Sequence, residues 1–223
     1  MKKLTPLNFQ TLSAPIYHNL MVQLISGVYE PGQRLKLNEL AEQTRTSVSP
    51  VREALIRLVS EESVEMSSLR AFAVPSLSSS RFKQILSIRL VLEGLAVEKA
   101  TENITQSEVD ELSKLHAKFV SAETNKERLE AQSLNRRIHF LIYNRANMPM
   151  LMTSILNLWA KMGPILSVYY SDKIDVTFGA PDHLNLFEAL GAKDCSKAVD
   201  AVQADITHGC SAIDNYIREL EGL

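Results

Sequence analysis

From residue 79 to near its end, the chain repeats the apolar spacing of amphipathic helices, and no other feature constrains its fold as strongly. Apolar residues recur every three or four positions, which brings them to one face of a helix. Short breaks containing Asn, Pro, Gly or Asp separate the repeats, so consecutive helices are expected to run antiparallel in one bundle. The six expected helices cover residues 79–102, 106–122, 126–146, 149–170, 180–192 and 194–220.

The preceding residues have shorter elements in a different order. Apolar spacing predicts a helix over residues 17–28 and a shorter one around residues 37–41. A third helix is expected to begin near Ser47, because Pro50 is tolerated only in a first turn. Two strand-like runs within residues 64–74 then predict a β-hairpin. This order is typical of a winged helix-turn-helix.

The Pro- and Ser-rich segment 75–80 indicates a linker between these two parts. We therefore expect a mainly α protein with two domains. Residues 1–78 form the winged helix-turn-helix, and residues 79–223 form an all-helical bundle.

The composition of the chain says more about its cellular compartment than about its function. A net charge of −2 argues against nucleic-acid binding over the whole surface, although residues 1–57 carry seven Lys and Arg against four Glu. The two cysteines, Cys195 and Cys210, lack metal or disulfide spacing and indicate a reducing compartment and a packing role. No apolar run is long enough for a signal peptide or a membrane helix, so we expect a cytoplasmic protein without membrane contact.

The stretch TRTSVSPVREALIRL (44–58) has the residue types that a DNA-contacting helix uses. Small hydroxyls at Ser47 and Ser49 let the backbone approach phosphates, and either one can cap the exposed amides. Arg52 and Arg57 lie off the apolar stripe and are expected to face DNA or water. The alternative from spacing alone is a capped surface helix with solvated charges.

Three segments of the N-terminal part resemble the signature of GntR-family bacterial transcription regulators: PGQRL (31–35), LAE (40–42) and SVSPVREALIRL (47–58). IRLVLEGLAVEKA (88–100) resembles the start of the helical ligand-binding (FCD) domain of the FadR-like subfamily. The helical part has a length similar to that of the shorter, VanR-type domains of this subfamily. The sequence as a whole is similar to McbR-type regulators.

The resemblance implies DNA-contacting residues, carried over one position at a time. Arg34 matches a phosphate-contacting position, and Ser47, Ser49 and Arg52 match recognition-helix contacts. Val48 stands where many relatives have arginine, which predicts contact with a thymine methyl group in place of guanine recognition. In the wing, Arg70 is a further DNA candidate, but Ala71 replaces the usual glycine and puts the wing contact in doubt.

The resemblance also implies a divalent-metal site, in an altered form. Metal-binding relatives carry Asp-x-x-x-His on the third helix of the bundle and one histidine on each of the last two helices. The matching positions are Asn135, His139, His183 and Asp205, with His208 one turn beyond. Asp205 then restores the charge missing at Asn135, and His208 adds a donor. Such donors suit Zn²⁺ or Ni²⁺ and leave positions open for a carboxylate ligand. The alternative is a set of hydrogen-bonded pocket residues without a metal.

Arg89 lies on or beside an apolar stripe, where an unpaired guanidinium is costly. It therefore pairs with Glu93, its i+4 neighbour, or lines a cavity and binds a small organic acid. The effector site implied by the family is lined by Arg89, Asn135, His139 and His183, with Tyr169 as a minor candidate. Trp159 is expected in the core, and His18 and His116 at the surface.

These observations favour a transcription regulator that is not an enzyme. We expect a homodimeric repressor that binds a palindromic operator in double-stranded DNA and responds to a small organic acid. The main alternative is a metal-dependent hydrolase in the helical part, although HExxH, Gly-x-Ser-x-Gly and phosphate-binding glycine loops are absent from the sequence. A scaffold protein is the third reading, and it leaves the Ser-led, Arg-bearing helix without a role.

Overall fold

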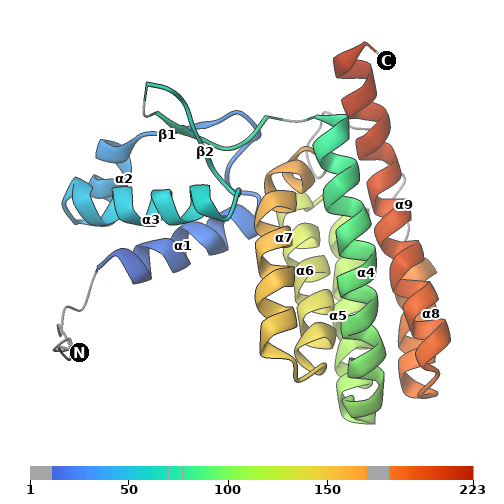
Figure 1. Ribbon diagram of the computed structural model, residues 1–223. Helices are drawn as coiled ribbons and strands as arrows, with labels where there is room; N and C mark the ends of the chain where they lie inside the picture. The colour runs from blue at the N-terminus through green and yellow to red at the C-terminus, as the bar shows by residue number, and fades with distance from the viewer. Residues whose placement is uncertain (1–11, 70, 77, 170–180, 223) are drawn as a thin grey trace, which may run out of the picture.

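A computed structural model describes residues 12–69, 71–76, 78–169 and 181–222. Figure 1 shows a group of short helices with a small sheet beside a bundle of mostly longer helices. The elements in chain order are α1 (Ser13–Ile25), β1 (Arg34–Leu35), α2 (Leu37–Gln43), α3 (Val48–Ser60), β2 (Glu65–Met66), β3 (Phe72–Ala73), α4 (Ser79–Asn103), α5 (Gln106–Thr124), α6 (Arg128–Asn144), α7 (Pro149–Tyr169), α8 (Pro181–Gly191) and α9 (Cys195–Glu221).

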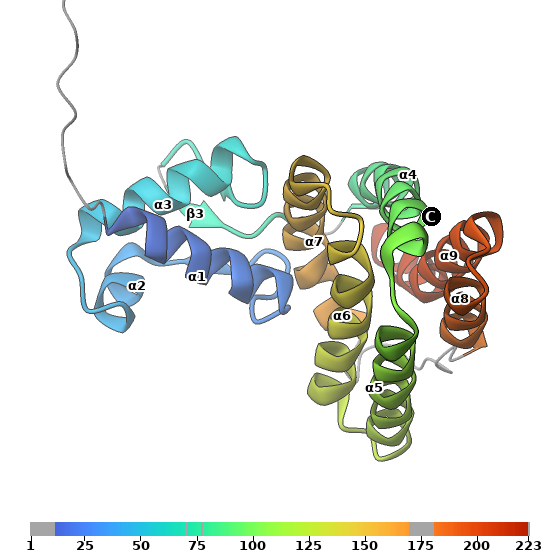
Figure 2. The ribbon, with the colours of Figure 1, turned by 90° about the horizontal axis from the view of Figure 1, so that it is seen from below.

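The helical bundle confirms the fold class expected from the apolar spacing. Helix α4 packs against α6, α7 and α9, while α5 packs against α6 and α8 (Figure 2). Each of its helices begins and ends within a few residues of the predicted bounds, since capping signals lie at the expected breaks. Ser78 caps α4 by accepting from the Arg81 amide at 3.3 Å, and Thr105 with Glu108 forms a capping box on α5. No helix in the described ranges is long and apolar enough to cross a bilayer.

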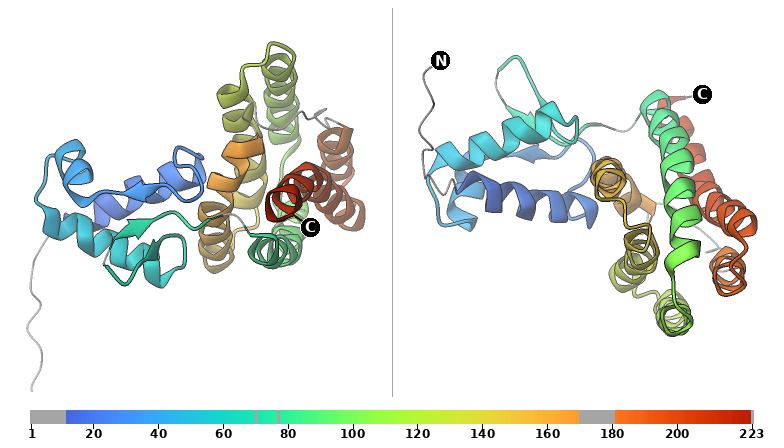
Figure 3. Two further views of the ribbon diagram at one scale, coloured as in Figure 1. Left: turned by 90° about the horizontal axis from the view of Figure 1, so that it is seen from above. Right: turned by 60° about the horizontal axis from the view of Figure 1, so that its bottom comes forward.

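The N-terminal part is the expected winged helix-turn-helix. Helix α3 packs against both α1 and α2. The sheet and these three helices lie together on one side of the bundle (Figure 3). The predicted hairpin is formed by β2 and β3, which pair antiparallel with Met66 opposite Phe72. A third strand, β1, pairs with the other edge of β3 through Arg34 opposite Ala73. Strand β1 was not predicted, because a strand of two residues shows no alternation of apolar and polar side chains.

Helix α1 ends earlier than predicted. It was expected to run to residue 28, but it ends at Ile25 because Gly27 takes a left-handed conformation with φ of +65°. The Val28 amide then donates back to the Gln23 carbonyl at 3.0 Å. Val28, which we placed on the buried stripe, is consequently 60% exposed.

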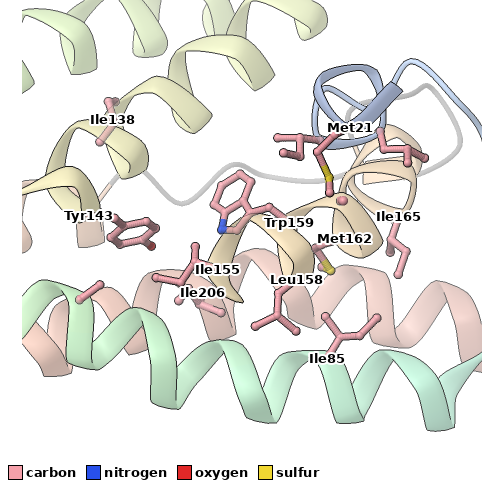
Figure 4. Close-up of a cluster of buried hydrophobic side chains, with 14 of the residues drawn as sticks. Met21, Ile85, Ile138, Tyr143, Ile155, Leu158, Trp159, Met162, Ile165 and Ile206 are labelled. Carbon is pink, nitrogen blue, oxygen red and sulfur yellow. The ribbon is translucent and has the colours of Figure 1, made fainter. Parts of the chain in front are cut away.

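The end of α1 packs directly on α7, and this contact joins the N-terminal part to the bundle. Met21 of α1 lies in one buried cluster with Met162 and Ile165 of α7 (Figure 4). Next to them the two backbones meet at Gly163, where an added Cβ would lie 2.0 Å from the Leu24 carbonyl oxygen. Only glycine permits this approach.

Candidate nucleic-acid interface and candidate metal centre

The start of α3 presents polar groups outward. Ser47 and Ser49 are exposed, and the Ser47 side chain makes no capping hydrogen bond, so the expected cap is not formed. Both serine side chains are therefore accessible at the start of α3. Arg52 is half-buried one turn later, and its side chain makes no hydrogen bond or ion pair within the described part of the chain. This surface has the donors that phosphates and base edges accept.

Two other α3 residues are held by the protein itself. Val48 is half-buried and packs against the core, which leaves only part of its side chain at the surface. Arg57, expected to face DNA or water, stacks 3.6 Å above the Tyr17 ring and pairs with Glu61 at 3.1 Å. Burial and the hydrogen bond to Glu61 raise the pKa of Tyr17 to about 12. Arg57 thus fastens α3 to α1.

The sheet brings a second cation to the surface of the N-terminal part. Arg34 is exposed on β1, opposite Ala73 of the hairpin. Ala71 is exposed at the end of the hairpin loop, where the Ser67 amide donates to its carbonyl at 2.9 Å and its own amide donates to the Ser67 hydroxyl at 3.2 Å. Arg70 lies outside the described residues, so its DNA contact stays a prediction.

Three side chains from different helices meet inside the bundle: His139 of α6, His183 of α8 and Asp205 of α9. Their ligand atoms all lie within 4.8 Å of one another. His139 Nε2 is 3.2 Å from Asp205 Oδ2, and His183 Nε2 is 3.3 Å from Asp205 Oδ1. Both histidines are buried, at 2% and 1% exposure. Burial opposes ionisation of Asp205, but His183 and His139 outweigh it and lower the pKa of this carboxyl below its ordinary value.

The other predicted site residues do not all join this group. Asn135 is half-buried one turn before His139 on α6. His208, expected as a fourth donor, is exposed and is not among the gathered donors. It lies beside Thr207 on a part of α9 where both side chains are exposed. The side chain of Tyr169 lies outside the described residues.

A buried network supports His139 from behind. The Tyr143 hydroxyl lies 3.0 Å from His139 Nδ1 and donates to Glu93 Oε2 at 2.5 Å. Glu93, fully buried, also accepts from Trp159 Nε1 at 3.2 Å and from Arg89 Nε at 2.6 Å. Of the two alternatives for Arg89, the structure therefore shows the pair with Glu93. Trp159 is in the core as expected, and its indole nitrogen has a specific partner there.

The same network sets the charges of its members. Burial alone would lower the pKa of Arg89, but the charge and hydrogen bonds of Glu93 raise it above the ordinary value. Burial and the nearby Glu93 raise the pKa of Tyr143 well above its ordinary value. The arginine therefore stays cationic and the tyrosine stays a hydrogen-bond donor.

His116 was expected at the surface, and this expectation is wrong. It is 6% exposed on α5, and its Nδ1 lies 3.4 Å from Nδ1 of His183. Burial lowers the pKa of His116 below its ordinary value. Its spacing from Leu112 and Phe119 already marked the buried stripe of α5, so periodicity could have found it. His18 is exposed as expected.

Known proteins with this architecture are bacterial regulators. Residues 12–74 match the bacterial regulatory proteins of the gntR family, and residues 84–208 match the FCD domain. The chain is 36% identical to the HTH-type transcriptional regulator McbR of Escherichia coli K12, over 82% of this chain and 84% of that protein. It is 24% identical to the HTH-type transcriptional repressor RspR of the same strain, over 95% and 91%.

A solved structure carries the same fold along nearly its whole length. The structure of E. coli McbR/YncC matches with a TM-score of 0.83 at 32% identity, covering 93% of this chain and 99% of that chain. These relatives are named as transcription regulators and not as enzymes, so the hydrolase alternative has no support. The chain belongs to the gntR family of bacterial regulatory proteins, as a transcription regulator with an FCD domain.

Proposed function

We propose that this regulator represses transcription by binding a palindromic operator as a homodimer. The observation that carries the proposal is the start of α3, where Ser47 and Ser49 are exposed and Arg52 is half-buried. In winged helix-turn-helix proteins this end of the third helix enters the major groove. Ser47 and Ser49 then contact phosphates, while Arg52 contacts a phosphate or a guanine edge. Arg34 adds a phosphate contact beside the groove.

Replacing Arg52 by alanine is expected to weaken operator binding by about 1–3 kcal/mol and to lower the salt dependence by about one counterion if its partner is a phosphate. The measurement is fluorescence anisotropy of the full chain with DNA from upstream of its own gene, at several salt concentrations. Arg137→Ala is the matched control, since Arg137 is an exposed arginine on α6. Equal loss in both variants, or wild-type binding that ignores salt, would refute the interface.

The same proposal gives the helical bundle a sensory role, in which a divalent metal at His139, His183 and Asp205 binds a small organic carboxylate. The hydrogen bonds support this reading. Because the Tyr143 proton goes to Glu93, the Tyr143 oxygen accepts from Nδ1–H of His139. The Nε2 lone pair of His139 then faces the Asp205 carboxylate at 3.2 Å. Two electron-rich groups at this distance repel unless a proton or a metal ion joins them.

When bound, Zn²⁺ or Ni²⁺ would supply open coordination positions for an effector carboxylate. Arg89 keeps its partner Glu93 in this scheme, so the effector does not need to displace a buried ion pair. The effector regulates DNA binding only if it prefers one arrangement of the two DNA-binding parts over the other. Helix α7 is suited to transmit that preference, because its Trp159 donates to Glu93 and its Gly163 contacts α1.

The metal proposal predicts that the full chain binds about one Zn²⁺ or Ni²⁺ and that Asp205→Asn lowers the affinity strongly. The loss should exceed the roughly 10- to 100-fold effect of removing a partner behind a ligand, because Asp205 supplies the anionic donor. Isothermal titration of metal-free protein, with elemental analysis of the purified protein, measures both quantities. Asp200→Asn, an exposed acid on the same helix, should bind as the wild type does. Equal affinity in the two variants would exclude Asp205 as a ligand.

A further inference from the structure

We propose that His116 is a positioning residue of the metal centre, which holds His183 in the tautomer that binds metal. This inference rests on the proposed metal site. His116 approaches His183 from α5, a helix that supplies none of the three gathered donors. It therefore adds a residue to the site behind the metal ligands.

The geometry leaves one arrangement of protons that serves metal binding. The Nε2 atom of His183 faces Asp205, and its Nδ1 faces Nδ1 of His116 at 3.4 Å. If Nε2 is to offer its lone pair to a metal, the ring proton of neutral His183 must sit on Nδ1. That proton needs an acceptor, and Nδ1 of His116 is placed to be one. His116 must then carry its own proton on Nε2.

The two histidine ligands thus have matching supports. Nδ1 of His139 faces the Tyr143 oxygen at 3.0 Å, and Nδ1 of His183 faces His116. Ligating histidines in metal sites generally donate their second N–H to an acceptor, which fixes the ring orientation and raises ligand basicity. At His183 the acceptor is a neutral imidazole instead of the more common carboxylate or carbonyl.

Aromatic side chains hold the two rings in this position. His183 stacks on Phe187 with an interplanar angle of 11°, and His116 meets the edge of the same ring at 88°. Phe119 lies against both histidines, with centroid distances of 6.0 Å to His116 and 5.3 Å to His183. The rings exclude water from the Nδ1 pair, so His116 is not simply replaced by solvent when it is removed.

The test compares His116→Phe, which keeps a ring of similar size but loses the acceptor, with His116→Asn, whose Oδ1 takes the place of Nδ1. Metal-free full-length protein is titrated with Zn²⁺ and with Co²⁺, whose visible spectrum reports the coordination geometry. His116→Phe should lower the affinity about 10- to 100-fold and change the Co²⁺ spectrum. His116→Asn should restore both to near the wild type. Lys114→Ala, at an exposed position of the same helix, should leave the affinity unchanged.

A second measurement needs no variant. Long-range ¹H–¹⁵N spectra of the metal-loaded wild-type chain should show His183 protonated at Nδ1 and His116 protonated at Nε2. The opposite assignment, or wild-type affinity in His116→Phe, would overturn the role of His116 while Asp205→Asn still reports on the metal site. If the wild-type chain binds neither metal, the proposed site and the role of His116 fail together.

Discussion

Replacing Glu93 by glutamine is expected to lower the free energy of unfolding by about 3–5 kcal/mol, since it leaves the cation of Arg89 buried without a counter-charge. The Arg89 side chain is 5% exposed and that of Glu93 is fully buried. Both Nε and Nη2 of Arg89 donate to this carboxylate. Glutamine keeps the shape but removes the charge. Urea unfolding of the metal-free chain, followed by circular dichroism, measures the loss.

A double variant separates the lost charge from a general packing defect. In Arg89→Met/Glu93→Gln the cation is also removed, and the single glutamine oxygen can still accept from either Tyr143 or Trp159, which donate to different oxygens of Glu93 in the wild type. This variant should recover a large part of the stability that Glu93→Gln loses. If Glu93→Gln lowers the free energy of unfolding by less than about 1 kcal/mol, the negative charge of Glu93 is not what stabilises the buried cation of Arg89.

Replacing Gly163 by alanine is the second large effect, and it should disrupt the contact between α1 and α7. The added Cβ would lie 2.0 Å from the Leu24 carbonyl oxygen and 2.8 Å from that of Ile25. Both are backbone atoms, so α1 itself must move. We expect a loss of about 1–3 kcal/mol, as is typical of overpacking, and easier proteolysis of the N-terminal part. Unfolding and limited trypsin digestion of the full chain check the two effects.

Gly209 provides the matched control, because it is also helical but a Cβ there meets nothing within 4 Å. Gly209→Ala should raise stability by up to about 1 kcal/mol through helix propensity. If Gly163→Ala behaves in the same way, α1 and α7 are not in the close contact described above. Metal affinity should stay normal in both variants, since neither glycine lies among the donors.

The helices could be predicted from the sequence because their signals lie within each segment. Apolar spacing and breaks such as Asn147-Met148-Pro149 give the bounds of the long helices to within a few residues. The misses have equally local reasons. Strand β1 is too short to alternate, and α1 ends at Ile25 because Gly27 turns left-handed before the expected Pro-Gly turn.

For the candidate site, the sequence predicted several of the residues, but only the folded structure shows which of them are in contact. The family resemblance predicted a metal site of five residues, and the structure gathers three of them, His139, His183 and Asp205, without Asn135 and His208. We expected His116 at the surface, although its spacing on α5 matches the buried stripe, and no spacing could reveal its neighbour, which is 67 positions later in the chain. Likewise, i+4 spacing allowed Arg89 to meet Glu93 but did not exclude an external acid.

The sequence by itself determined which segments are helical, which face of each is apolar, and which family the chain resembles. Only the tertiary structure decided that His116 lies next to His183, that Arg57 stacks on Tyr17, and that α1 meets α7 at Gly163. The physical reason is that periodicity reports the environment of one helix face. Contacts between distant segments depend on how side chains of several helices interlock, and no single segment carries that information.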